Sequence, residues 1–285
     1  MENIERIPKL RRAPILWRCC AYILMLCFAL LTIFPMVWLA YSSLKPHAEI
    51  MLHPLALPQA PTFNNYFRAW TMGGLGAALG NSFIYTISAT AATLFLALAA
   101  AYGLTKFPFK SRSFFTAAFA LGLMIAVHAV LIPLFIMERQ VGILNRRAGV
   151  ILPYIAFDLP MSIMIAISYI KGIPDALIES AEIDGAKYGA VFWKLIVPLS
   201  TPVVATMTIL SFLRHWNEFL FVFLFTTKMS LKSLPVAITQ FAGKTNVEYG
   251  LQYASLIIGI FPMIVFYFFF HAQLIKGFGE GSLKE

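Results

Sequence analysis

A short acidic stretch, 179–186 (ESAEIDGA), is the part of this sequence best suited to a defined interaction. Pro174 and Asp175 predict a helix start before it, since proline loses no hydrogen bond in a first turn and aspartate accepts unpaired N–H groups. Gly185 predicts a left-handed stop. A helix lying on a membrane normally shows lysines opposite bulky apolar residues. Here the polar side is acidic and the apolar side small, which favours docking into a protein cleft, with a membrane-surface helix as the alternative.

Polar side chains inside apolar stretches form a second group of candidates, because such residues are costly in a bilayer and are often functional there. Arg214 and Glu218 are one helical turn apart, so they could neutralise each other, or snorkel to the interface, or line a pathway. Packing and pathway roles are both open for the remaining residues. The candidates for a transport pathway are Asn81, His128, Asp158, Arg214 and Asn217.

The sequence does not favour an enzyme or a nucleotide-binding protein. Gly243-Lys244-Thr245 resembles the end of a phosphate-binding loop, but that motif needs glycine five positions before Gly243, where Ile238 stands. The 5 histidines are scattered, and no paired carboxylates, catalytic order of Ser, His and Asp, or metal-ligand spacing is present. We therefore expect no ATP, other cofactor or metal to bind to this chain, and no catalytic activity.

The composition is that of a membrane protein. Hydrophobic residues make up 60% of the chain and charged residues 12%, whereas charged residues are roughly a quarter of a soluble domain. A membrane-spanning helix needs roughly 20 apolar residues. Charge-free runs that could hold one lie within 18–45, 68–106, 112–138 and 248–276, and runs with isolated charges cover 148–170 and 199–227. These predict an all-α integral membrane protein with six transmembrane helices.

The distribution of charge predicts the orientation. The net charge is +9, but basic residues favour the side of the N-terminus, as the positive-inside rule requires of cytoplasmic segments. Both termini are therefore expected in the cytoplasm, and nucleic acid is not an expected partner. The first apolar run is too long for a signal peptide and lacks a cleavage site, so it should be retained. Cys19, Cys20 and Cys27 lie in it; adjacent thiols cannot form an ordinary bridge, which favours a packing role.

These features divide the chain into three parts. Residues 1–18 are expected to be a cytoplasmic N-terminal segment, 19–275 a six-span domain and 276–285 a cytoplasmic tail. Spans three and four are expected over 113–137 and 148–170. The proline-rich segment 46–70 predicts a packed, irregular external loop. Residues 171–198, which contain the acidic stretch, connect spans four and five.

Several short motifs in the same order resemble one family, the permeases of binding-protein-dependent ABC importers. Glu-x-Ala-x-x-x-Gly from Glu179, with Pro198 a dozen residues on, resembles the coupling-loop signature of that family. The further similar stretches are 61–66 (PTFNNY), 81–82 (NS), 100–104 (AAYGL) with Phe107, 216–219 (WNEF) and the tail residues Gln273, Gly277 and 281–284 (GSLK). The chain is most similar to the smaller permease subunits of carbohydrate importers, of the maltose-transporter G type.

The resemblance implies a heteromeric sugar importer of the bacterial inner membrane. Its partners would be a second, different permease, two ATP-binding subunits that hold ATP and Mg, and an extracytoplasmic solute-binding protein. A cytoplasmic coupling helix between spans four and five, in the coupling loop 171–198, would sit in a cleft of one ATP-binding subunit. The residues implied in this contact are Glu179, Ser180, Ala181, Asp184, Gly185 and Pro198, and tail residues Gly281, Ser282, Leu283 and Lys284 would also reach the ATP-binding subunits. Two departures are Ser180 in place of a second alanine and Glu285 as the last residue.

A stand-alone secondary carrier or channel is the alternative function. Such a protein would show an inverted repeat, or interrupted spans around a buried ionisable site. The sequence displays neither feature.

Overall fold

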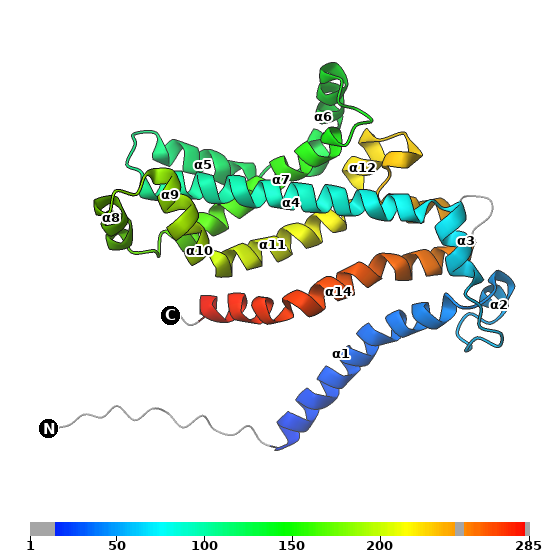
Figure 1. The fold of residues 1–285 in the computed structure, drawn as a ribbon. Coiled ribbons are helices and arrows are strands. Elements are labelled where there is room, and N and C mark those ends of the chain that lie inside the picture. Colours follow the sequence, from blue (N-terminus) through cyan, green and yellow to red (C-terminus); the bar gives the residue numbers. More distant parts are fainter. Residues whose placement is uncertain (1–14, 243–247, 283–285) are drawn as a thin grey trace.

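The computed structural model describes residues 15–242 and 248–282, and all the regular elements in these residues are helices (Figure 1). Of these, 4 are long and apolar enough to cross a membrane. They are α1 (Ile15–Ser42), α4 (Leu75–Lys106), α7 (Ala148–Ile170) and α14 (Tyr249–Ser282). The prediction of an all-α membrane protein is confirmed.

Two further candidate spans are bent pairs of helices. The axes of α5 (Arg112–Gly122) and α6 (Val127–Val141) differ by 101°. A helical stretch made of α9 (Tyr188–Val191), the π-helical η1 (Phe192–Ile196) and α10 (Val197–Leu199) meets α11 (Thr201–Trp216) at 76°. If each pair is one span, the total is up to 6. The expectation of one continuous helix over 113–137 is wrong, because the chain turns between Gly122 and Val127, where Gly122 packs closely against Pro160 of α7.

The helix expected over 199–227 is also interrupted, and the motif 216–219 supplies the reason. Asn217 Nδ2 donates to Leu213 O at 2.9 Å and satisfies a carbonyl at the end of α11. Glu218 Oε1 accepts from Phe221 N at 3.0 Å and caps the first turn of α12 (Leu220–Phe225). These two adjacent side chains therefore end one helix and begin the next.

The core lies between α4 and α7, which run side by side. Ala97 and Ala101 of α4 and Ala166 of α7 are fully buried, and such small side chains let two helix backbones approach closely. Met207 of α11 and Ile196 of η1 complete this cluster. The pair α4–α7 therefore forms the frame on which the shorter elements are placed.

Helix α1 leaves this body and meets it near one end only (Figure 1). Trp38 packs edge-on against Tyr253 of α14, with ring centroids 5.3 Å apart, while its apolar side chains from Ile23 to Val37 are largely exposed. Cys19, Cys20 and Cys27 are free and exposed on α1, so they do not pack against other parts of this chain. The apolar surface of α1 therefore faces away from the rest of this chain.

The proline-rich segment after α1 is packed, as predicted, but contains two short helices, α2 (His47–Leu52) and α3 (Asn64–Met72). The side chain of Asn65 is buried and its Nδ2 donates to the carbonyls of Ser43 and Lys45, both at 2.8 Å. Lys45 Nζ donates to His53 O at 3.1 Å. These bonds fold the segment back onto the end of α1.

Candidate functional site

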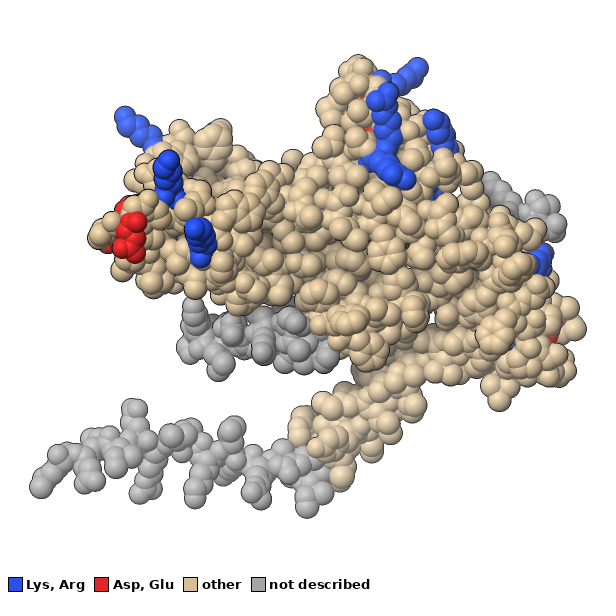
Figure 2. Space-filling model, viewed as in Figure 1, with Lys and Arg blue, Asp and Glu red and all other residues tan. Residues whose placement is uncertain are grey.

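The acidic stretch forms a short helix, α8 (Asp175–Ile183), at one end of the molecule. Ile178 is buried beneath it, whereas Glu179, Glu182 and Asp184 are exposed (Figure 2). Ile183 is 86% exposed, an unusual position for an isoleucine in a helix that has a buried side. The outer surface of α8 thus combines carboxylates with an uncovered apolar side chain.

The predicted left-handed stop at Gly185 is confirmed. Gly185 has φ +80°, and Ala186 N donates to Ala181 O at 2.9 Å, which closes the helix end. A β-carbon added at Gly185 would meet no atom within 4 Å. The space beyond Gly185 is therefore open to a partner.

A buried lysine, which the sequence reasoning missed, ties α8 to the body. Lys106, the last residue of α4, has a side chain only 6% exposed; its Nζ lies 2.6 Å from Asp175 Oδ1 and donates to Ile173 O at 2.6 Å. A basic residue at a helix C-terminus was the available signal. Lys106 connects the start of α8 directly to the frame helix α4.

A groove of about 930 Å³ follows α8 and has mostly small residues along its walls. Ala181, Gly185, Ala186 and Gly189 line it together with Lys187 and Lys194. Glu179 and Ser180 are exposed beside it, and Ser180 Oγ donates to Leu177 O at 3.1 Å. Pro198 is exposed in α10 and is not among the lining residues.

The predicted tail contact falls largely outside the described part of the chain. Gly281 and Ser282 continue α14 as backbone, and Leu283 and Lys284 lie outside the described residues. Gly243, Lys244 and Thr245 lie outside them as well.

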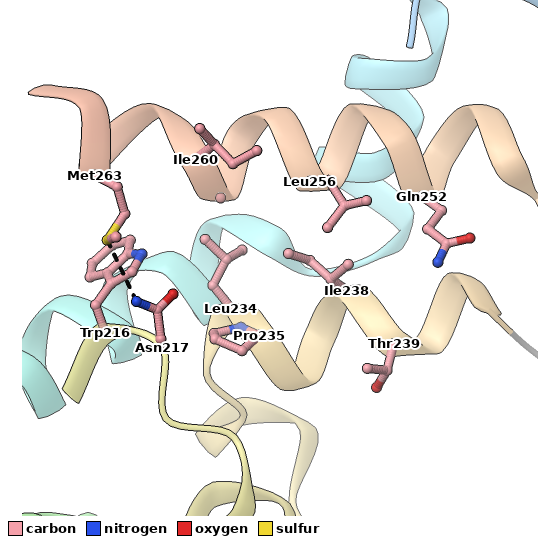
Figure 3. Close-up of a pocket in the computed structure, with 11 residues that line it drawn as sticks. Trp216, Asn217, Leu234, Pro235, Ile238, Thr239, Gln252, Leu256, Ile260 and Met263 are labelled. Atoms are coloured by element: carbon pink, nitrogen blue, oxygen red, sulfur yellow. Dashed lines mark hydrogen bonds between the residues drawn. The ribbon is translucent and has the colours of Figure 1, made fainter. Parts of the chain in front are cut away.

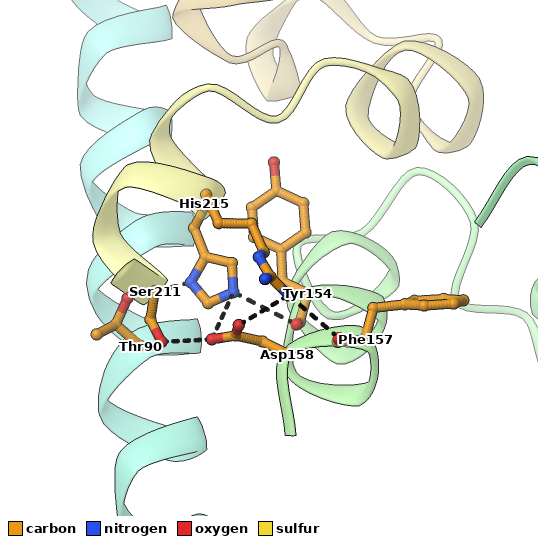
Figure 4. A network of polar contacts seen from close by, with 7 residues as sticks. Thr90, Tyr154, Phe157, Asp158, Ser211 and His215 are labelled. Carbon is orange, nitrogen blue, oxygen red and sulfur yellow. Dashed lines mark hydrogen bonds and ion pairs between the residues drawn. The ribbon is translucent and has the colours of Figure 1, made fainter. Parts of the chain in front are cut away.

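Asp158 is the centre of a buried polar network between α7 and α11 (Figure 4). Arg214 Nη1 lies 3.1 Å from Asp158 Oδ1, and Ser211 Oγ donates to Asp158 Oδ2. His215 Nε2 is 3.6 Å from Oδ2, and its Nδ1 is 3.1 Å from Thr90 Oγ1 of α4. The network joins three helices at one depth of the bundle.

These contacts decide between the alternatives for Arg214. Its ion pair is with Asp158 of α7, and Glu218 instead caps α12. Self-pairing of Arg214 with Glu218 is therefore wrong. The Arg214 side chain is 50% exposed, so one edge of the network reaches the surface of this chain.

The other pathway candidates are separated from the network. Asn81 is buried at the start of α4, and its Nδ2 donates to Ser230 O at 2.8 Å and Lys232 O at 3.1 Å. It binds a loop. His128 is exposed near the start of α6.

Asn217 lies at a cavity of about 450 Å³ between α11, α13 (Leu234–Ile238) and α14 (Figure 3). Trp216, Leu256 and Met263 give it an apolar wall, and Gln252 and Thr239 supply polar groups. Asn217 Nδ2 also approaches Met263 Sδ at 4.0 Å. The cavity is therefore lined by both apolar and polar side chains.

The end of the molecule opposite α8 is fastened by side chains that sequence reasoning did not single out. Tyr85 OH donates to Leu231 O at 2.8 Å, and Ser82 Oγ accepts from Leu234 N at 2.8 Å. Lys232 Nζ donates to Thr226 O, and burial lowers the pKa of this lysine. The loop before α13 is therefore held at several points.

Comparison with known proteins identifies the family of this fold. Residues 93–277, which include the C-terminal part of α4 and all of α7, α8 and α11, match the family described as binding-protein-dependent transport system inner membrane component. The chain belongs to this family. The family resemblance expected from the motifs is confirmed.

Relatives of this permease match over most of its length. It is 30% identical to the probable ABC transporter permease protein YurM of Bacillus subtilis over 99% of the chain and 94% of that protein. Identity is 35% to the sulfoquinovosyl glycerol transport system permease protein SmoH of Agrobacterium fabrum, with 88% of the chain and 89% of SmoH covered. It is 33% to the trehalose transport system permease protein SugB of Mycobacterium tuberculosis, with 88% and 92% covered.

A solved structure shows the same fold. The chain superimposes with a TM-score of 0.80 on a chain of a bacterial ABC transporter involved in the import of the acidic polysaccharide alginate. The superposition covers 91% of this permease and 97% of that chain at 24% identity. The fold of the permease is thus that of an ABC transporter membrane subunit.

Proposed function

We propose that this permease is a transmembrane subunit of an ATP-driven importer that moves a sugar or oligosaccharide across the bacterial inner membrane. The observation that carries the proposal is the family match over 93–277, together with relatives whose names specify sugars. The exposed end of α8 supports the proposal, because a subunit driven by a separate ATPase needs a surface to which the ATPase can bind. A second permease would complete the translocation pathway.

The residues of 171–198 form the coupling loop in this proposal. Glu179, Ser180, Ala181, Asp184 and Gly185 would enter a cleft of one ATP-binding subunit, with Pro198 shaping the return to α11. Lys106 supports this role, since it joins α8 to α4 and so offers a direct route for a push on α8 to reach the frame helices. The tail from Gly281 to Lys284 would make a second contact.

The orientation follows from the same assignment. If α8 docks an ATP-binding subunit, then residues 1–18, 171–198 and 276–285 are cytoplasmic, and the loop before α13 faces outwards. A fusion at Glu285 to a reporter that works only in the cytoplasm should then be active. A fusion there to alkaline phosphatase, which is active only after export, should be inactive.

ATP and Mg would be held by the two ATP-binding subunits, and this chain would have no catalytic role. The detergent-purified permease alone should neither bind nor hydrolyse ATP. Saturable photolabelling of the isolated chain by a nucleotide, lost in Lys244→Ala, would contradict this.

The substrate contacts proposed for this chain are few. Asn217 faces the cavity between α11 and α14, whereas Asp158 and Arg214 neutralise each other and Asn81 holds a loop. The part of Arg214 that is exposed and His128 remain pathway candidates.

Co-purification tests the proposed function. The tagged permease, extracted in mild detergent, should bring with it two ATP-binding subunits and a second permease, and the complex should hydrolyse ATP faster with a substrate-loaded solute-binding protein. Isolation of the chain alone, with ion-driven sugar uptake after reconstitution, would contradict it.

A further inference from the structure

Shortly after the C-terminal end of α1 the chain carries a run of uncovered apolar side chains. It covers residues 51–57 (MLHPLAL), called here the apolar segment, and contains no Asp, Glu, Lys or Arg. Leu52, Leu55 and Leu57 are 68% to 74% exposed, and Met51 is 60% exposed. An exposed group of large apolar side chains marks a contact with another protein or with a membrane.

The backbone of the apolar segment receives hydrogen bonds from side chains of α1. Trp38 Nε1 donates to Pro54 O at 2.9 Å, and Tyr41 OH donates to Leu55 O at 2.9 Å. Water would supply donors to the carbonyls of an exposed loop, whereas hydrocarbon supplies none, so backbone near acyl chains must be satisfied from within the protein. These bonds therefore suit a loop that lies against lipid.

Lys45 is arranged in the same way. Its side chain is fully buried, and its Nζ donates to His53 O at 3.1 Å and to Pro54 O at 3.3 Å. Backbone carbonyls are common partners of a basic residue at membrane depth. A lysine at an aqueous surface instead keeps its ammonium group in water. The chain thus directs this charge inward and the leucines outward.

Trp38 and Tyr41 also set the depth of the apolar segment. They lie in the last two turns of the membrane-length stretch Cys19–Ser42, and tryptophan and tyrosine are typical of the membrane–water interface. Their bonds to Pro54 and Leu55 hold the segment beside these turns, at the end of α1 (Figure 1). The exposed leucines are therefore placed where headgroups meet acyl chains.

We propose that the apolar segment is a lipid anchor, which inserts Leu52, Leu55 and Leu57 into one leaflet of the bilayer. Under the orientation proposed above, this is the outer leaflet. A protein that covered the segment could donate hydrogen bonds to its carbonyls, whereas acyl chains cannot, so the donors within this chain favour lipid as the occupant. The anchor would hold the end of α1 at a fixed depth.

Spin labels in proteoliposomes test the proposal. Cys19, Cys20 and Cys27 are replaced by serine, and single labels are attached at Leu55→Cys and Leu57→Cys in the permease with whatever subunits copurify. Relaxation by oxygen, which dissolves among acyl chains, is compared with relaxation by a nickel chelate, which stays in water. Both labels should give an oxygen-to-nickel ratio about tenfold higher than a control label at Lys228→Cys, an exposed site in the loop after α12.

Two results would overturn the proposal. Ratios at Leu55→Cys and Leu57→Cys equal to that at Lys228→Cys would place the apolar segment in water. Labels that neither reagent relaxes would show that a protein covers it. The measurement requires neither uptake nor ATP hydrolysis, so it decides the proposal even for a permease that purifies alone, a result that would instead remove the proposed function.

Discussion

At one end of α4 the helix α8 presents Glu179, Glu182 and Asp184. At the other, basic end, the loop before α7 and the loop after α12 present Arg146, Arg147 and Lys228. The supports differ as much as the charges. The basic end is fastened by Asn145 and by side chains of α4, whereas the start of α8 is tied to α4 through Lys106. Segments with few buried contacts open at lower free energy than the core does.

This difference indicates two kinds of contact. A fixed surface suits a partner that arrives, docks and leaves without changing it. A short helix with one strong attachment suits a partner that stays bound and moves it. Between the two ends of the molecule, the buried Asp158 network connects α7 to α11 and to Thr90 of α4. Both ends are therefore attached to the same set of helices.

The largest effect is expected at the acidic end. Gly185→Asp should abolish ATP-coupled uptake while the permease is still inserted. An added β-carbon meets no atom of this chain, so the fold bears only a conformational cost of roughly 1 kcal/mol. The new carboxylate beside Asp184 would enter the partner contact, where a like-charge juxtaposition costs several kcal/mol. Uptake and ATPase activity in proteoliposomes measure this.

Ser180→Ala is the matched control for Gly185→Asp, because it removes only a local bond to Leu177 O on an exposed helix. It should transport at nearly the wild-type rate. Substrate-stimulated uptake retained by the Gly185→Asp complex would remove the docking role of α8.

The second largest effect is expected on the stability of the helices that Asp158 joins. Asp158→Ala leaves the guanidinium of Arg214 and the imidazole of His215 without their carboxylate. Because the Arg214 side chain is 50% exposed, the cost should be below the about 3–5 kcal/mol of a fully buried ion pair. We expect a marked fall in thermal unfolding temperature of the purified complex. Thr206→Ala, which removes a bond within α11, should change it little. Equal stability of the two variants would show that the network does not join the helices.

At the basic end, Asn145→Ala should lower the free energy of unfolding by about 2 kcal/mol, because it leaves N–H groups of the 227–228 loop unpaired and keeps a strained φ. Asn145→Gly loses the same hydrogen bonds, but glycine adopts the positive φ without strain. Its loss of unfolding free energy should therefore be about 1 kcal/mol smaller than that of Asn145→Ala. Chemical denaturation in a fixed detergent compares them. A glycine variant less stable than the alanine variant would contradict the assigned strain.

The smallest effect concerns the attachment of α8. Lys106→Met keeps a buried apolar stem but removes both contacts to 173–175, and Asp175 is exposed enough to remain hydrated. Uptake per ATP hydrolysed should fall by about twofold to fivefold, in line with one partly exposed ion pair and a hydrogen bond. Lys110→Met, at an exposed position on the same side, should not alter the ratio. An unchanged ratio in Lys106→Met would mean that α8 acts on the frame by another route.

The sequence predicted what is encoded locally. The 4 membrane-length helices, the Pro174 start and the Gly185 stop depend on residues next to one another, and these were found. Contacts between distant residues were not predictable in this way. Local spacing suggested Arg214 with Glu218, whereas the fold brings Asp158 to Arg214 from another helix.

Helix breaks were similarly difficult to predict. The turn after Gly122 contains no proline, and the Asn217-Glu218 caps look like ordinary polar residues in an apolar run until the two helices are seen. Asn145 followed by two arginines offered a weak turn signal only, because asparagine tolerates the left-handed region better than most residues.

Crosslinking at Ile183 tests the central claim most directly, since this side chain is the most uncovered apolar group on α8. Cys19, Cys20 and Cys27 are first replaced by serine. Ile183→Cys is then combined with single cysteines along the cleft of the ATP-binding subunit, and the assembled complex is treated with a short bifunctional thiol reagent. We predict a product that joins the permease to an ATP-binding subunit and that changes in yield when ATP is added. Crosslinks from Ile183→Cys only to the solute-binding protein, or modification only by lipid-soluble reagents, would contradict the account.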